Sequence, residues 1–231
     1  MLVMKNILKI SGIVLLLFLV HTCCKDEDNI IKDADGNVYT SVIIGTQTWM
    51  AENLKTTKYN DGSEIPYIID EWAFLTTDAY CWYNNDSTTN KNVYGALYNW
   101  YAVNKGKLCP EGWHVPSDSE WTVLTDYLGG ESTAGGRLKE IGTSHWRDQS
   151  VGATNDSGFT ALTGGYRDSG PDTPSHPVAL FWNLTLSGYW WTSTSKDEFF
   201  AWFRDINSSN SKLSRGNFPY RTGFSVRCLK N

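Results

Sequence analysis

The chain of 231 residues has little cysteine, histidine or proline and only one long hydrophobic run. Beyond the N-terminal pair, the cysteines are Cys81, Cys109 and Cys228, none at the close spacing typical of zinc sites, so we expect no metal and no other cofactor. Only 19% of residues are charged and there are seven prolines, whereas 14% are aromatic, a composition typical of a folded globule rather than of disorder.

The one long hydrophobic run, Ile10–Val20, follows Lys5 and Lys9. A basic start before a short apolar stretch is the layout of a secretory signal peptide. As a helix this run would span roughly 17 Å at about 1.5 Å per residue, against a hydrocarbon core of about 30 Å. Its length therefore argues against a transmembrane anchor.

Two cysteines follow the run, and the segment resembles a bacterial lipobox. Val20 stands three residues before Cys23 and a small threonine directly before it, whereas Cys24 would put His21 in the aliphatic position. We predict a lipoprotein signal peptide over residues 1–22 and a lipid anchor on Cys23, whose acyl chains would hold the protein at a membrane. The alternative is an ordinary signal peptide that is cleaved elsewhere.

The segment after Cys23 is charged and resembles the surface-export signal of Bacteroidetes lipoproteins. Lys25 is followed by three acidic residues, Asp26-Glu27-Asp28. The resemblance implies an outer-membrane protein that faces outward, and the alternative is a solvated tether without that meaning. We assign residues 23–32 to a lipidated polar tether.

The net charge excludes nucleic acid as a partner. Without residues 1–22, 18 basic and 25 acidic residues remain, a net charge of −7, and the basic residues are scattered singly. Binding to phosphate backbones needs a clustered basic surface. The remaining residues, 33–231, are compatible with one domain.

The start of the domain, Asp33-Ala-Asp-Gly-Asn37, has some likeness to a calcium loop. An EF-hand loop places glycine sixth and glutamate twelfth, whereas here glycine is fourth and Ile44 is twelfth. We predict a turn before a strand over Val38–Ile44, and a second short strand over Tyr80–Tyr83.

Two helices are predicted in the first half. Residues 95–104 place apolar side chains at helical spacing, among them Trp100. Ser117 and Glu120 form a capping-box pattern before a second helix that ends at the glycine pair after Leu128. We expect Trp100 and Trp121 to be core residues.

The second half is predicted to be a long irregular region, Gly142–Tyr189, followed by strands over Tyr189–Thr192, Phe199–Ile206 and Phe224–Leu229. Early helices and late strands indicate an α+β fold. Cys228 shares one face of the last strand with Phe224 and Val226, so we expect it to be buried. Its disulfide partner could be Cys81 or Cys109.

Many short motifs together resemble the Fibrobacter succinogenes major paralogous domain over about residues 33–229. They are Asp35-Gly-Asn37, Gln47–Leu54, Tyr94–Trp100, Cys109–Pro116, Glu120-Trp121, Leu128–Gly130, Ser157–Phe159, Gly164–Arg167 and Ser225–Cys228. That family is similar in pattern to C-type-lectin-like domains and to formylglycine-generating enzymes. The resemblance implies a lectin-like α+β scaffold with a long loop region, and it brings no catalytic residues.

An enzyme is not favoured. Formylglycine-generating enzymes use two cysteines close together near the end of the domain, where this chain has only Cys228. No Gly-x-Ser-x-Gly motif accompanies His114, His145 or His176. We expect His114 to be a packed, hydrogen-bonded side chain and the other two to lie at the surface.

The leading functional hypothesis is an envelope-anchored binding module for a glycan or a protein, because aromatic and arginine side chains dominate contact surfaces. The candidate contact residues are His145, Trp146, Tyr166, Arg167, Trp182, Trp190 and Trp202. The alternative is a structural scaffold of an envelope assembly, in which these rings are all buried.

Overall fold

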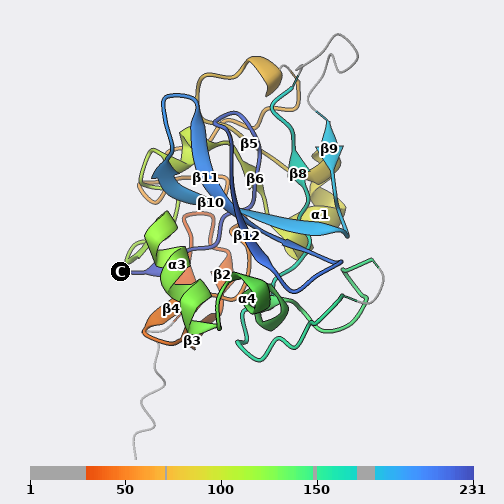
Figure 1. Ribbon diagram of the computed structural model, residues 1–231. Helices are drawn as coiled ribbons and strands as arrows, with labels where there is room; N and C mark the ends of the chain where they lie inside the picture. Colours follow the sequence, from red (N-terminus) through yellow and green to blue (C-terminus); the bar gives the residue numbers. More distant parts are fainter. Residues whose placement is uncertain (1–29, 71, 148–149, 171–179) are drawn as a thin grey trace, which may run out of the picture.

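We use a computed structural model of the protein, of which residues 30–70, 72–147, 150–170 and 180–231 are described (Figure 1). The predicted signal peptide, Cys23 and His176 lie outside the described residues. In these ranges no helix has the length and apolar character needed to cross a membrane.

The fold is mixed, with small antiparallel sheets and few helices, as the sequence predicted. The strands are β1 (Ile31–Lys32), β2 (Val38–Tyr39), β3 (Ser41–Ile44), β4 (Gln47–Met50), β5 (Tyr80–Cys81), β6 (Leu97–Tyr98), β7 (Trp113–His114), β8 (Tyr166–Arg167), β9 (Phe181–Trp182), β10 (Ser187–Ser195), β11 (Phe200–Asn207), β12 (Leu213–Pro219) and β13 (Leu229–Lys230). The helices are η2 (Trp72–Phe74), η3 (Tyr83–Asn85), α1 (Ser87–Tyr94), α2 (Trp100–Val103), α3 (Asp118–Tyr127) and α4 (Glu131–Leu138).

The longest strands form one antiparallel sheet in the order β10-β11-β12, which crosses the middle of the molecule (Figure 1). Its two faces meet different parts of the core, because neighbouring side chains on a strand point to opposite faces. Trp190 packs on the face toward Trp121 of α3, and Trp191 packs on the other face against Phe224. A second sheet has the order β3-β4-β13-β7.

The C-terminal segment runs between these sheets and is buried on both sides. Phe224, Val226 and Cys228 are fully buried, as predicted, but so are Ser225 and Arg227. Only β13 is a regular strand there, which is shorter than the predicted Phe224–Leu229. Residues 224 and 225 are joined to Tyr98 and Trp190 by isolated bridges instead.

The disulfide joins Cys109 to Cys228, while Cys81 is a free, buried thiol. Burial raises the pKa of the Cys81 thiol to about 12, which keeps it protonated and unreactive. The structure therefore shows that Cys109, and not Cys81, is the disulfide partner of Cys228, which the sequence left open.

The first predicted helix is wrong in its bounds. Residues 87–94 form α1, which begins at the Asp86 cap on the Thr89 amide and ends at Gly95 with a φ of 77°. A strand, β6, follows, and only Trp100–Val103 is helical in the remainder, capped by Asn99. Apolar spacing alone could not separate a short strand from a helix here.

The second predicted helix is confirmed as α3. Ser117 accepts from the Glu120 amide and the Glu120 carboxylate accepts from the Ser117 amide, which is the predicted capping box. Trp121 is fully buried, as expected.

Helix α4 was not predicted, because two glycines in its middle disfavour a helix. The structure shows why glycine is needed: a Cβ on Gly135 would lie 2.1 Å from the Lys212 carbonyl oxygen, and one on Gly136 would lie 2.3 Å from that of Gly152. Close backbone packing against Lys212 and Gly152 therefore overrides helix propensity.

The predicted turn at the start of the domain is confirmed as the β1-β2 hairpin. The Asp33 carboxylate accepts hydrogen bonds from the amides of Asp35 and Asn37, the Asn37 side chain and the Tyr39 hydroxyl. The predicted strand Val38–Ile44 is divided at Thr40, because β2 pairs with β1 and β3 pairs with β4.

Candidate functional site

The best candidate site is a hollow of about 310 Å³ at the end of the molecule where η2 lies, opposite β3 and β4 (Figure 1). We call it the apical hollow. It is lined by Leu75, Thr76, Tyr101, Phe199, Pro219, Tyr220 and Arg221. Five of these seven side chains are apolar or aromatic, so the hollow is a mainly apolar surface with a polar rim.

Tyr220 is held in place by the core beneath it. Its ring stacks on Trp100 with centroids 4.3 Å apart and an interplanar angle of 19°. The Trp100 indole is itself fixed, because it donates to the Thr192 carbonyl oxygen at 2.9 Å. Burial raises the pKa of the Tyr220 phenol, and its hydroxyl donates to the Asp197 carbonyl oxygen. The ring is therefore a rigid platform.

Tyr101 stands beside this platform because α2 positions it. The Asn99 side chain accepts from the Ala102 amide at 3.1 Å and so caps the helix one residue before Trp100. The Tyr101 ring then meets Tyr220 edge to face, with centroids 5.6 Å apart. Two rings at different angles line the same hollow.

Phe199 is the most exposed ring of the apical hollow, with 68% of its surface accessible. It lies in the turn between β10 and β11, where the Asp197 carboxylate accepts from the amides of Phe199 and Phe200 at 2.9 and 3.0 Å. The Tyr220 amide also donates to the Phe199 carbonyl oxygen at 2.8 Å. A turn tied in this way holds an apolar ring at the surface beside the apical hollow.

Arg221 supplies the positive charge of the rim. It is exposed and makes no ion pair with any described residue. Its carbonyl oxygen accepts from the Trp72 indole, which ties the rim to η2. The rim therefore combines an unpaired guanidinium with the hydroxyl of the exposed Thr76.

Three of the residues predicted to contact a ligand are instead part of the core. Trp146 and Trp190 are 1% and 0% exposed, and their indoles donate to the Ala161 carbonyl oxygen and the Asn53 side chain. Arg167 is 4% exposed, lies between Trp72 and Phe181, and donates to the carbonyl oxygens of residues 68 and 69. We correct the prediction for these three, because a domain rich in aromatic residues must bury most of its rings.

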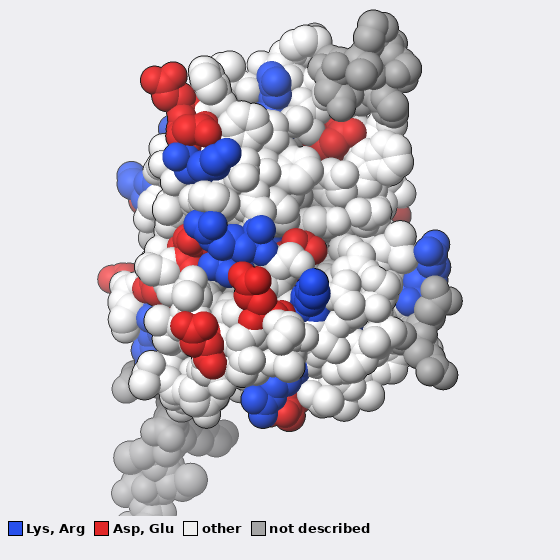
Figure 2. Space-filling view, in the orientation of Figure 1, with Lys and Arg blue, Asp and Glu red and all other residues white. Residues whose placement is uncertain are grey.

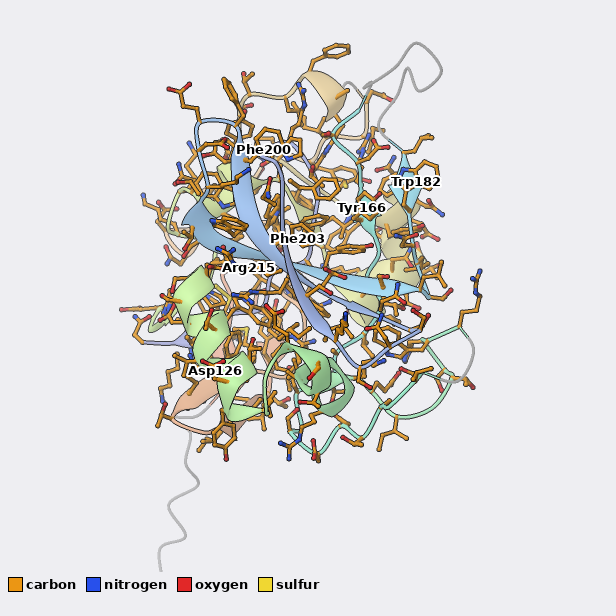
Figure 3. The ribbon with its side chains drawn as sticks, in the orientation of Figure 1. Asp126, Tyr166, Trp182, Phe200, Phe203 and Arg215 are labelled. Atoms are coloured by element: carbon orange, nitrogen blue, oxygen red, sulfur yellow. A yellow bond between two sulfur atoms is a disulfide. The ribbon has the colours of Figure 1, made fainter. Side chains whose placement is uncertain are left out.

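The other predicted residues lie at or near the surface but not in the apical hollow. Tyr166 is half-buried against Tyr189 at 5.0 Å, Trp182 donates to the Asp168 carboxylate, and Trp202 is covered by the Arg215 guanidinium at 3.3 Å. Figure 2 shows charged side chains gathered near Arg215 and α3, with largely uncharged surface toward Tyr166 and Trp182, which Figure 3 labels.

The described histidines are hydrogen-bonded to acidic or amide side chains. His114 contacts the Glu120 carboxylate at 2.9 Å and the Asn231 side chain at 2.7 Å. His145 is half-buried and contacts the Glu140 carboxylate at 2.8 Å. Neither pairs with a serine or cysteine nucleophile, and no metal-ligating group of three or more side chains occurs within the described ranges.

The family model of the Fibrobacter succinogenes major domain matches residues 42–230. The chain belongs to this family. No curated protein matches the chain, and no solved structure does. All residues of the apical hollow lie within the part that matches the Fibrobacter succinogenes major domain, whereas Cys23 precedes it.

Sequence reasoning missed the aromatic residues of the apical hollow. One signal was present in this member of the Fibrobacter succinogenes major domain family: Phe199 and Phe200 are adjacent after the polar segment Ser193–Glu198. Because neighbouring side chains on a strand point to opposite faces, two adjacent rings cannot pack on the same face of a sheet. Nothing in the sequence could have shown that Tyr101 and Tyr220 lie beside them.

Proposed function

We propose that this protein is a non-catalytic binding module, anchored to the bacterial outer membrane by a lipid on Cys23, and that its apical hollow binds a glycan. The observation that carries the proposal is the 68% exposed ring of Phe199, which a hydrogen-bonded turn holds beside Tyr101 and Tyr220. Three aromatic side chains grouped around one hollow form an apolar surface that a ligand can cover, which a single exposed ring does not.

A sugar fits the chemistry of this hollow. The apolar faces of sugar rings pack on aromatic rings, and a few polar groups fix their orientation. The apical hollow offers rings at different angles, the Thr76 hydroxyl and the unpaired guanidinium of Arg221. Its volume of about 310 Å³ lies at the small end of ligand sites, which favours one or two sugar rings over a long chain.

The position of the hollow supports a role in display. The described chain begins at Ile30 beside Ser41 and Ile43 of β3, and the apical hollow lies at the opposite end of the molecule (Figure 1). A lipid on Cys23 would hold the β3 end near the membrane and direct the hollow away from it. We also propose that the scaffold is lectin-like and that the domain faces outward.

The test is glycan binding by the mature protein on an array of envelope and plant polysaccharides, followed by titration of each hit. We expect Phe199→Ala to weaken binding by at least about fivefold, because stacked aromatic contacts contribute about 1 kcal/mol beyond their buried area. Its thermal unfolding temperature should not fall, since the ring is exposed. Tyr127→Ala, which removes another exposed ring, 63% accessible on α3, is the matched control and should bind as the wild type does.

A wild-type protein that binds no glycan on a broad panel would contradict the glycan assignment and favour the structural scaffold. The anchor is tested separately by palmitate labelling of cells that express the wild type or Cys23→Ala, with protease treatment of intact cells. Labelling that persists in Cys23→Ala would contradict the assignment of the anchor to Cys23. Labelled protein that protease cannot reach would contradict outward display.

A further inference from the structure

A second pocket, separate from the apical hollow, has a buried arginine in its wall. It has a volume of about 240 Å³ and shares no residue with the apical hollow. It is lined by Thr40, Ala51, Glu52, Asn53, Lys55, Lys91, Asn92, Val93, Gly95, Thr160, Leu162 and Arg227. Because Arg227 is only 1% exposed, it forms the floor of the pocket.

The guanidinium of Arg227 is only partly satisfied. Its Nε and Nη2 donate to the Asn53 side-chain oxygen at 3.3 and 3.0 Å, and its Nη1 donates to the Phe159 carbonyl oxygen. A guanidinium has five N–H groups. The described residues thus supply neutral acceptors for three of them, and the remaining two, one on each terminal nitrogen, have none.

The positive charges around this pocket lack counter-ions. Within the described residues, none of Arg227, Lys55 and Lys91 takes part in an ion pair. Lys55 and Lys91 lie over the rings of Tyr39 and Trp82 at 5.8 and 5.5 Å, and both are half-buried. They form the rim above Arg227.

The one acidic residue in the lining, Glu52, can balance only one of these three charges. Both oxygens of the Glu52 carboxylate accept from Thr40, at 2.9 Å from the amide and 2.8 Å from the hydroxyl. Three cations therefore face one carboxylate that is already hydrogen-bonded. The pocket has an excess of positive charge.

Keeping a cation in this position is unfavourable for the empty protein. The buried guanidinium has lost its hydration. Its three hydrogen bonds, the ring of Phe159 at 4.0 Å and the nearby charge of Glu52 compensate for only part of that loss. Burial lowers the pKa of Arg227 to about 9, so the group still carries its charge at neutral pH. An anion in the pocket would supply both the missing acceptors and the missing charge.

We propose that this pocket binds a small oxyanion, a carboxylate or phosphate group, with Arg227 at its floor and Lys55 and Lys91 at its rim. The planar fork of a guanidinium matches the two oxygens of either group. An acidic sugar and a phosphorylated ligand share this chemistry. The site is independent of the apical hollow, so the two assignments can fail separately.

The experiment is calorimetric titration of the mature protein with glucuronate and with inorganic phosphate, with neutral glucose as the control ligand. We expect at least one anion to bind, glucose not to bind in this pocket, and affinity to fall as salt is raised. Binding of glucuronate alone identifies an acidic sugar as the ligand class, and binding of phosphate alone identifies a phosphorylated one.

The lysines at the rim are the better variants, because Arg227→Gln removes hydrogen bonds in the core and can unfold the protein. We expect Lys55→Gln and Lys91→Gln each to weaken anion binding by about fivefold, as loss of a partly screened charge does. Lys212→Gln, which replaces an exposed lysine outside the pocket, should have no effect. The proposal is overturned if neither anion binds, or if both rim variants bind the anions as the wild type does.

Discussion

Removal of the disulfide between Cys109 and Cys228 should destabilise the protein strongly. The two cysteines are 119 residues apart in sequence, so the bond closes more than half of the chain into a loop. In the chain-entropy account, closing a loop of this length lowers the conformational entropy of the unfolded state, which stabilises the folded protein by about 5 kcal/mol at 25 °C. The free energy of unfolding of a typical domain is only about 5–15 kcal/mol. Loss of the disulfide would therefore remove a large part of the stability of this domain.

The perturbation is the double variant Cys109→Ala and Cys228→Ala, because alanine introduces no buried polar group at two sites that are 2% and 0% exposed. Urea unfolding followed by tryptophan fluorescence gives the free energy of unfolding. The reduced wild type should unfold at the same urea concentration as the double variant. Cys81→Ala, which keeps the disulfide, is the control against exchange with the free thiol.

A loss of less than about 1 kcal/mol in the double variant would refute the reasoning. It would mean that the unfolded chain is already held together near these positions, or that the bond strains the folded state. A difference between the reduced wild type and the double variant would instead show that the free thiols matter in themselves.

Two further predictions concern charged groups around the β10-β11-β12 sheet. Burial raises the pKa of Asp205 to about 6, so the stability that is present below its unfolded pKa is lost as pH rises through 6. Asp205→Asn should therefore stabilise the protein by up to about 3 kcal/mol at pH 7.5 and have little effect at pH 4, as measured by urea unfolding. An equal effect at both pH values would contradict this cause. The Asp118 carboxylate accepts from Arg204, which is 2% exposed, and from Arg215. Asp118→Asn should therefore lower the free energy of unfolding by about 3–5 kcal/mol, because it leaves a buried guanidinium without its counter-ion. Arg215→Ala, which removes the exposed partner, should lower it by less than about 1 kcal/mol, and similar losses in both variants would disprove the argument.

Local signals in the sequence were reliable where a few neighbouring residues decide the outcome. The capping box at Ser117 and the turn after Asp33 were predicted correctly, because each depends on hydrogen bonds within about five residues. Helix α4 and the interrupted segment 95–104 were not predicted correctly, because each depends on contacts with residues that are distant in sequence. Gly135 is helical because it packs on the Lys212 backbone, and β6 is a strand because it pairs with β5.

The chain alone was sufficient to indicate a mixed α and β domain of the Fibrobacter succinogenes major family, rich in aromatic residues. Whether a given ring is buried or exposed was decided only by the tertiary structure. Trp146 and Phe199 both follow polar residues in sequence, yet one is 1% exposed and the other 68%. The physical reason is that exposure depends on what covers a side chain, and the covering residues come from distant parts of the chain. The same holds for Arg227, whose unpaired charge is visible only once its neighbours are in place.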